Sequence, residues 1–347
     1  MRILLVDSNL HYPVNPLFLE GLNQLAEEQG YEYEFVDQGK FLEPLERLLV
    51  HKVAYRLLGR RPLTYWIFNR ALLASVNRFR PDVILVVKGA HVSPATLRSI
   101  KRESGAFLIN YATDDPFNPA VNTRGLINGI ALYDLYACTK RAIMDDVRRT
   151  GCKDVIYVPF GYKPSVHYPD IPRTGEEKSR FTSDVVFIGG CDRDRTPYFE
   201  ALVRQLPEVR LHLYGGYWER HPLLRRYHRG FALGRDYRLA LSGAKIAINL
   251  VRRANRDGHV MRTFEIPACG AFMLAERTEE HLELFEEDQD AVFFGSAEEM
   301  VEKIRYYLAD DAQRVRIAEA GHRWVTNGAN TYADRLLQIV KVDEPFS

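Results

Sequence analysis

Residues 257–276, DGHVMRTFEIPACGAFMLAE, hold most of the polar side chains that could do chemistry together. Asp257-Gly258 is a dipeptide typical of turns. Thr263 is expected to cap a short helix that carries Glu265, and Gly270 stands where such a helix needs a left-handed terminal residue. The apolar run that follows predicts a short buried strand. The stretch therefore predicts a loop, a helix and a strand that present their polar groups at one place.

The chemistry these groups suggest is the binding of a nucleotide. A helix start offers backbone N–H groups and the positive end of a dipole, which suits a phosphate. Glu265 could accept hydrogen bonds from two vicinal hydroxyls, as in a ribose, and the planar fork of Arg262 suits a diphosphate. Eight residues at 100° each place Asp257 about 80° away from Glu265 around a helix. We therefore expect Asp257 in the preceding loop, near the reacting part of the same ligand. His259 is a candidate contact to a sugar, although a single loop histidine is more often simply exposed.

A pair of glycines opens a second candidate site. SDVVFIGGCDRDRTPYFEALVRQLP predicts a strand, a turn at Gly189 and Gly190, a basic loop and a helix. This order of elements lets backbone amides and a helix start hold a phosphate. One glycine pair is a weak signal by itself, and its position ahead of the Glu265 stretch strengthens it.

Two neighbouring carboxylates end a predicted strand in the N-terminal half. AFLINYATDDPFN places Asp114 and Asp115 directly after the apolar run. Side chains at the carboxyl end of a strand in a doubly wound sheet line the ligand crevice. The alternative is a turn in which an aspartate side chain bonds its own backbone and caps the strand.

FEIPACG resembles the C-terminal signature of glycosyltransferases with the two-domain GT-B fold. In that family a glutamate ahead of ACG binds the nucleotide ribose, which implies this role for Glu265. The acidic pair spaced eight apart in family 4 glycosyltransferases falls on Asp257 and Glu265, with Asp in place of the usual first Glu. RTFEIPACGAFML is more specifically similar to the CgeB-type (spore-maturation-like) branch of glycosyltransferase group 1. The resemblance extends from the first strand to about Arg335, and its C-terminal half is the more specific.

The resemblance also assigns roles to other residues. A basic residue after the glycine turn meets the donor diphosphate in GT-B relatives, which implies Arg195 first and Arg193 second. The Asp114-Asp115-Pro116 run looks like the N-domain pattern of the family, so either aspartate is a candidate acceptor-side base or acceptor ligand. The acidic pair implies retention of the anomeric configuration, with Asp257 at the donor sugar.

Length and composition fit a cytoplasmic two-domain protein. The 347 residues are 46% hydrophobic and 27% charged, with a net charge of +1, which argues against a nucleic-acid binder. The four cysteines are scattered and predict neither a metal site nor disulfides. The sequence shows no signal-peptide pattern, and no apolar run is long enough for a transmembrane helix.

Composition also suggests where the domains divide. We expect an N-terminal acceptor-side domain at 1–168, a linker at 169–182, where PDIPRTGEEKSRFT is rich in proline and charge, and a nucleotide-sugar domain at 183–330. The resemblance implies that a helix in 331–347 crosses back to the first domain. The fold class predicted is α/β, GT-B type, with two doubly wound Rossmann-like domains facing each other across a cleft.

A basic stretch interrupts the first domain. Residues 45–80 contain eight Lys or Arg and one acidic residue, Glu46, which gives about +7 in a nearly neutral chain. With Tyr65, Trp66 and Phe68, this basic amphipathic stretch could contact an anionic membrane surface or a negatively charged acceptor. The alternative is a pair of helices with solvated basic faces.

The function expected is transfer of a sugar from a nucleotide-diphosphate donor to an unidentified acceptor, without a metal or cofactor. The donor-binding residues expected are Gly189, Gly190, Arg193, Arg195, His259, Arg262, Thr263 and Glu265, and the catalytic ones are Asp114, Asp115 and Asp257. Two alternatives stay open. One is a sugar-nucleotide epimerase-like enzyme of the same fold, and the other is a non-catalytic two-domain ligand-binding or scaffold protein.

Overall fold

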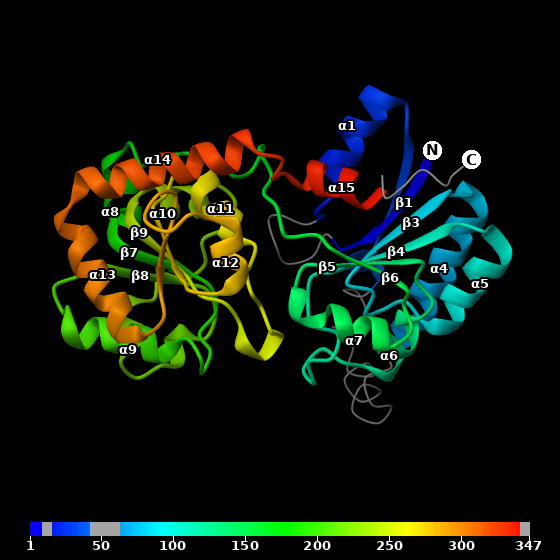
Figure 1. Cartoon of the computed structure of the whole chain (residues 1–347), viewed down its shortest axis with the longest axis horizontal. Helices are drawn as coiled ribbons and strands as arrows, with labels where there is room; N and C mark the ends of the chain where they lie inside the picture. The colour runs from blue at the N-terminus through cyan, green and yellow to red at the C-terminus, as the bar shows by residue number, and fades with distance from the viewer. Residues whose placement is uncertain (9–15, 42–62, 341–347) are drawn as a thin grey trace. The chain divides into compact units, whose positions relative to one another are not determined.

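The computed structural model describes residues 1–8, 16–41 and 63–340 of the chain. They form two compact units (Figure 1). Unit 1 comprises the described parts of Met1–Pro159 and Tyr332–Ser347, together with Ala254–Arg256. Unit 2 comprises Phe160–Arg253 and Asp257–Thr331. Each unit has a parallel sheet between helices, so the predicted α/β class is confirmed.

The sheet of unit 1 is six-stranded and has the order β2-β1-β3-β4-β5-β6, with every neighbouring pair parallel. Its strands are short apolar runs, as expected for a parallel sheet that is covered on both faces. They are β1 (Arg2–Asp7), β2 (Glu32–Asp37), β3 (Val83–Val87), β4 (Phe107–Ala112), β5 (Leu135–Cys138) and β6 (Asp154–Tyr157).

Helices cover both faces of this sheet. They are α1 (Leu19–Gln29), α4 (Leu63–Phe79), α5 (Pro94–Ser104), α6 (Arg124–Ile130), η1 (Arg141–Ile143), α7 (Met144–Arg149) and α15 (Tyr332–Val340). Leu4 and Val6 of β1 share one core cluster with Phe68 of α4 and with α5. On the opposite face α1 packs against α15, and Phe18 meets the ring of Tyr332 edge-on at 5.9 Å.

The sheet of unit 2 is five-stranded, in the order β11-β10-β9-β7-β8, and its neighbouring pairs are also parallel. Read from the other edge, this is the same doubly wound order as the first five strands of unit 1. The strands are β7 (Ser183–Ile188), β8 (Leu211–Tyr214), β9 (Ala244–Asn249), β10 (Met273–Glu276) and β11 (Val292–Phe294).

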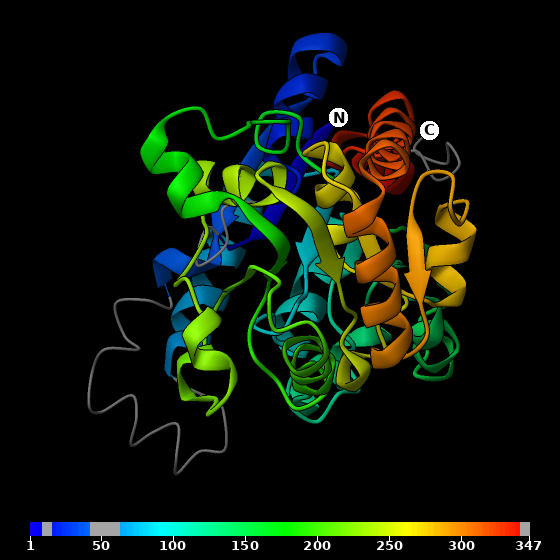
Figure 2. The same ribbon diagram turned by 90° about the vertical axis from the view of Figure 1, so that its left-hand side faces the viewer.

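The helices of unit 2 form a layer on each face of the sheet (Figures 1 and 2). Phe187 of β7 shares one core cluster with α9 and α13, and its neighbour Val186 shares another with α10, α11 and α14. The alternation follows from the two-residue period of a strand. The helices are α8 (Gly175–Phe181), α9 (Thr196–Gln205), η2 (Trp218–Arg220), η3 (Leu224–Tyr227), α10 (Arg235–Ser242), η4 (Arg253–Asn255, on the boundary of the units), α11 (Arg262–Ala268), α12 (Glu279–Leu284), α13 (Ala297–Ala309) and α14 (Asp311–Asn327).

The observed units divide the chain earlier than composition suggested. Unit 2 begins at Phe160, and the rings of Phe160 and Tyr162 belong to its core. The stretch 169–182, expected as a linker, contains α8, whose start is closed by a capping box of Thr174 and Glu177. Phe181 at its end is buried in the same core. The T-x-x-E pattern ahead of an apolar residue was the sequence signal for this helix.

Candidate functional site

The strand order of unit 2 reverses between β7 and β9. In a doubly wound sheet the ligand crevice lies at the carboxyl ends of the strands beside such a switch point. Here β7 ends on Gly189 and Gly190, and the turn after β8 packs directly against it. The N–H of Cys191 donates to the carbonyl of Gly216 at 2.9 Å, and a Cβ on Gly215 would lie 2.5 Å from the carbonyl oxygen of Gly189. The predicted glycine turn is therefore a tightly packed backbone corner at the expected edge.

Two arginines converge on the ring of Phe187 just below this corner. The guanidinium carbon of Arg195 lies 5.4 Å from the ring centroid, and that of Arg262 lies 5.8 Å from it. Arg195 is 5% exposed and donates from Nη1 to the carbonyl of Gly190 at 3.1 Å. The Nε atoms of both arginines are buried and have no hydrogen-bond partner among the described residues. Two guanidinium groups from distant parts of the sequence, those of Arg195 and Arg262, thus lie together at the ring of Phe187.

The electrostatics of this place favour an anion. Burial, followed by the neighbouring charge of Arg262, lowers the pKa of Arg195 to about 10, while the charge of Asp192 opposes the shift. Arg252 and Asp257 also act on Arg195, so the group contains three arginines and two aspartates. A cation whose charged form is disfavoured by a like charge is stabilised when an anion joins it. Arg193, the second choice from the sequence, is exposed and absent from this group.

Glu265 lies on α11 one turn after Arg262, and its side chain faces the interior. It is 4% exposed, and its Oε2 accepts a hydrogen bond from the hydroxyl of Tyr237 at 2.5 Å. Its Oε1 faces Nε2 of His167 at 3.7 Å. Residues three apart share a helix face, which places Glu265 beside the arginine pair. Sequence reasoning did not identify Tyr237 or His167, because neither belongs to a local motif.

The start of α11 differs from the expectation. The helix begins at Arg262, and the N–H groups of Thr263, Phe264 and Glu265 donate to the carbonyls of Val260 and Met261. They are therefore not open to a phosphate, and the expected helix-start site is wrong. Thr263 itself is 0% exposed, and its hydroxyl bonds Asn249 Nδ2 at 3.0 Å. The same hydroxyl accepts from the N–H of Val260 at 3.2 Å, which closes this turn.

Asp257 lies in the loop before α11, as predicted. Its N–H donates to the carbonyl of Arg252 and its Oδ2 accepts from the N–H of Arg252, both at 3.3 Å. These two bonds close the base of a short loop. Asp257 is only partly buried, and its charge acts on Arg195. The loop therefore holds this carboxylate near the arginine pair.

His259 is not a ligand contact in this structure. It is 0% exposed, its Nε2 accepts from the N–H of Phe160 at 3.0 Å, and its Nδ1 bonds Glu280 Oε2 at 2.6 Å. Both ring nitrogens are thus used inside unit 2, so the expectation that His259 contacts a sugar is wrong. A loop position in the sequence gave no sign of this burial.

The two aspartates of unit 1 have different surroundings. Asp115 is 2% exposed, and Arg256 binds both its oxygens, from Nε at 2.6 Å and from Nη2 at 3.0 Å. A carboxylate held in this way is a structural ion pair, so Asp115 is withdrawn as a candidate base. Asp114 keeps 27% of its side chain exposed and pairs with Lys88 Nζ at 3.2 Å. Of the two, Asp114 is the one that a second substrate could reach.

Exposed apolar side chains surround the glycine corner of unit 2. Tyr217 is 58% exposed, Phe231 63% and Leu233 55%. Tyr217 directly follows Gly216, and a Cβ on Gly216 would lie 3.8 Å from the ring of Phe231. Gly230 and Gly234, both with positive φ, flank the loop that carries Phe231 and Leu233. Exposed aromatic rings beside the glycine corner are suited to stacking on a planar base.

The basic stretch 45–80 lies partly outside the described residues, which resume at Leu63. Its described part, α4, exposes 64% of Trp66 and 40% of Ile67, and Arg70 stacks over the Trp66 ring at 5.4 Å. None of the described helices is long and apolar enough to cross a membrane. In the same described part of the chain, no cluster of three His, Cys, Asp or Glu side chains is arranged to hold a metal ion.

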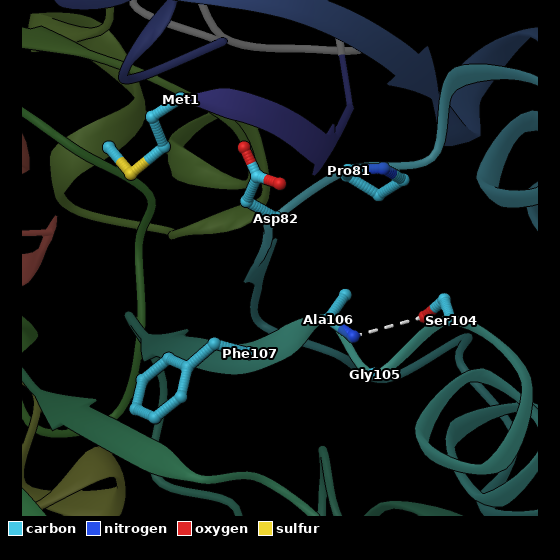
Figure 3. Close-up of a pocket in the computed structure, with 7 residues that line it drawn as sticks. All are labelled: Met1, Pro81, Asp82, Ser104, Gly105, Ala106 and Phe107. Carbon is cyan, nitrogen blue, oxygen red and sulfur yellow. Dashed lines mark hydrogen bonds between the residues drawn. The ribbon is translucent and has the colours of Figure 1, made fainter. Parts of the chain in front are cut away.

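Unit 1 has a pocket whose lining includes none of these candidate residues (Figure 3). It is lined by Met1, Pro81, Asp82, Ser104, Gly105, Ala106 and Phe107. Met1, Asp82 and Phe107 stand at the amino ends of β1, β3 and β4. Ligands of doubly wound sheets bind at the opposite, carboxyl ends, so we assign this pocket no part in the site.

Comparison with known proteins identifies the fold. The sucrose-phosphate synthase of Thermosynechococcus elongatus superimposes with a TM-score of 0.71 at 13% identity, over 99% of this chain and 98% of that one. HepE of Anabaena in complex with UDP-glucose gives 0.68 at 12%, over 98% of each chain. A glycosyltransferase from Rickettsia africae gives 0.64 at 12%, over 98% of this chain and 97% of that one. No curated protein matches the sequence.

The family match covers the C-terminal part of the chain. Residues 195–341 match the family model described as "Glycosyl transferase-like". This range includes Arg195, Asp257, Arg262 and Glu265. The chain therefore has two parallel-sheet α/β domains of the GT-B glycosyltransferase type, and its second half carries a glycosyl transferase-like domain.

Proposed function

We propose that the chain is a glycosyltransferase that uses a nucleoside diphosphate sugar as donor. The observation that carries the proposal is the pair Arg195 and Arg262 on the ring of Phe187, with excess positive charge at the switch point of unit 2. The GT-B fold and the glycosyl transferase-like match support it. So do the solved complexes of HepE with UDP and with UDP-glucose.

The donor would lie along the carboxyl ends of β7, β8 and β9. Arg195 and Arg262 would hold the diphosphate, and the exposed rings of Tyr217 and Phe231 would cover the base. Glu265 would accept hydrogen bonds from the ribose through the lone pairs that Tyr237 leaves open, since each carboxylate oxygen can accept two. We thus propose for Glu265 the role that the sequence predicted, which is binding of the nucleotide ribose.

The reaction would depend on charge stabilisation at the leaving group. As the glycosidic bond to the diphosphate breaks, negative charge grows on the departing oxygen, and preorganised cations stabilise it. The two arginines can supply this without a metal ion. Asp257 would contact the sugar, and by the resemblance to the acidic pair of family 4 the configuration would be retained. From the sequence we also propose that the chain belongs to the CgeB-like branch and that it is cytoplasmic.

On the acceptor side we propose Asp114. Its partly exposed carboxylate sits at the carboxyl end of β4 beside Lys88. A carboxylate there can orient an acceptor hydroxyl or take its proton.

An epimerase of the same fold is the second candidate. A putative UDP-N-acetylglucosamine 2-epimerase from Listeria monocytogenes superimposes with a TM-score of 0.60 at 12% identity, over 99% of this chain and 98% of that one. Product analysis separates the candidates. An epimerase converts the nucleotide sugar with no acceptor present, a transferase releases the nucleoside diphosphate in proportion to glycosylated acceptor, and a binding protein does neither.

Thermal unfolding with UDP, GDP, dTDP, ADP and CMP tests the site. A ligand at one hundred times its dissociation constant stabilises the folded state by about 2.7 kcal/mol. We expect one diphosphate to raise the midpoint without magnesium, and Arg262→Gln to remove the shift. Arg204→Gln is the matched control, because Arg204 is exposed on α9 and pairs with Glu200 of the same helix.

Two results of this experiment would contradict the proposal. If no nucleotide shifts the midpoint of the wild type, the arginine pair is not a donor site. If Arg204→Gln lowers the shift as much as Arg262→Gln does, the effect reflects net charge and not this pair.

A further inference from the structure

His259 and Glu280 form a buried pair below the loop that carries Asp257. His259 accepts the N–H of Phe160 on Nε2, so this nitrogen carries the lone pair and the ring proton lies on Nδ1. That N–H therefore donates to Oε2 of Glu280 at 2.6 Å. The histidine is 0% exposed and Glu280 is 5% exposed. The geometry thus defines a neutral histidine bonded to a buried carboxylate.

The carboxylate of Glu280 also packs closely against the backbone of Gly258, the residue after Asp257. A Cβ on Gly258 would lie 2.3 Å from Cδ of Glu280, so no other residue fits there without displacing the glutamate. The hydroxyl of Thr278, the residue that caps α12, donates to the carbonyl of Gly258. The first turn of α12 therefore holds Gly258 and His259 together, directly after Asp257.

The other end of the loop is held separately. Asp257 makes its two backbone bonds with Arg252, and Arg252 follows the end of β9. Asp257 thus stands between an anchor on β9 and an anchor on α12. The second anchor is built from side chains other than that of Asp257, so a conservative substitution can weaken it while Asp257 stays unchanged.

We propose that His259 and Glu280 are positioning residues for the donor sugar, acting through Asp257. This inference rests on the proposed function and adds to it the device that sets the place of Asp257. Neither side chain touches the ligand, since both are buried inside unit 2. Their effect is to keep one carboxylate within the narrow range of positions that a transfer reaction requires, where an error of 1 Å can cost about 100-fold in rate.

The test uses Glu280→Gln, which keeps an oxygen acceptor for His259 but removes the charge that orders the pair. His259→Gln is the second variant, because its amide oxygen can still accept from Phe160 while it loses the ring N–H. Glu200→Gln is the matched control. There His221 likewise accepts a backbone N–H, from Leu224, and faces Glu200 Oε1 at 3.2 Å, away from the Asp257 loop.

Two readouts separate positioning from general loss of structure. UDP lacks the sugar and UDP-glucose carries it, so their affinities and the turnover of UDP-glucose are measured for each variant. We expect UDP affinity to stay within about twofold, while turnover falls roughly 10- to 100-fold. Glu280→Gln combined with Asp257→Asn should be no slower than Asp257→Asn alone, because both changes act through the same carboxylate.

Hydrogen exchange of the backbone at 257–260 in the ligand-free protein is the third readout. It should be about tenfold faster in Glu280→Gln and unchanged in Glu200→Gln. Equal losses of UDP and UDP-glucose binding, additive effects in the double variant or unchanged exchange would each overturn the proposal. If none of UDP, GDP, dTDP, ADP and CMP binds the wild type, the proposed function fails and the sugar role fails with it. The exchange result then still decides whether the pair fixes the loop.

Discussion

Replacing Tyr237 by phenylalanine should destabilise unit 2 by more than an ordinary lost hydroxyl. The Tyr237 hydroxyl donates to Oε2 of Glu265 at 2.5 Å, and both residues are buried. Burial, followed by the charge of Glu265, raises the pKa of Tyr237 well above its usual value, so the hydroxyl remains a donor at every accessible pH. The substitution keeps the ring and leaves no cavity, so the lost bond is the main change.

The size of the effect follows from the charge of the acceptor. A hydrogen bond to a charged group contributes about 1.5–3 kcal/mol, against about 1 kcal/mol for a neutral one. In Tyr237→Phe the carboxylate of Glu265 loses this donor. Nε2 of His167 lies 3.7 Å from the other carboxylate oxygen, Oε1, which is too long for a hydrogen bond. We therefore expect a loss of about 2–3 kcal/mol in the free energy of unfolding.

Urea unfolding measures this loss as a lower midpoint at unchanged slope. Tyr214→Phe is the matched control, because Tyr214 is buried in the same core cluster and donates to the neutral carbonyl of Arg180 at 3.4 Å. It should cost about 1 kcal/mol or less. Glu265→Gln should cost less than Tyr237→Phe, and the double variant should cost less than the sum. Equal losses in Tyr237→Phe and Tyr214→Phe would refute a charge-assisted bond to Glu265.

Three further predictions concern other parts of the chain. Burial lowers the pKa of His281 from 6.5 to about 4, so below pH 6.5 the unfolded chain binds a proton that the folded protein cannot. Wild type should therefore lose up to about 3 kcal/mol of stability between pH 6.5 and 4, and His281→Gln should show a flatter dependence in urea titrations. Arg256→Gln leaves Asp115 buried and unpaired, which should cost about 3–5 kcal/mol in thermal unfolding, and an unchanged midpoint would contradict the ion pair. We also propose that the exposed Trp66 and Ile67 of α4 contact anionic lipid. Replacing both by alanine should then abolish sedimentation with phosphatidylglycerol vesicles, and undiminished sedimentation would exclude α4 as the contact.

Much of the fold could be read from the sequence because its signals are local. Apolar runs of strand length alternate with helix-length segments, and glycines or aspartates follow the strands at the predicted positions. The glycine turn at Gly189, the helix that carries Glu265 and the loop position of Asp257 all depend on residues within a few places of one another. The capping box of Thr174 and Glu177 is an equally local signal. It was missed because the proline and charge content of 169–182 favoured a linker.

The partners of the site residues could not be read in this way. Arg256 reaches Asp115 across 141 positions and Tyr237 reaches Glu265 across 28, and no spacing rule links them. His259 and Thr263 looked like ligand contacts because they stand beside the motif, and the structure buries both. The sequence by itself determined the two series of strands and helices and the edge where polar residues collect. Only the tertiary structure decided which of these residues are buried and bonded within the protein. Burial and pairing depend on elements that lie far apart in the sequence and meet in the fold.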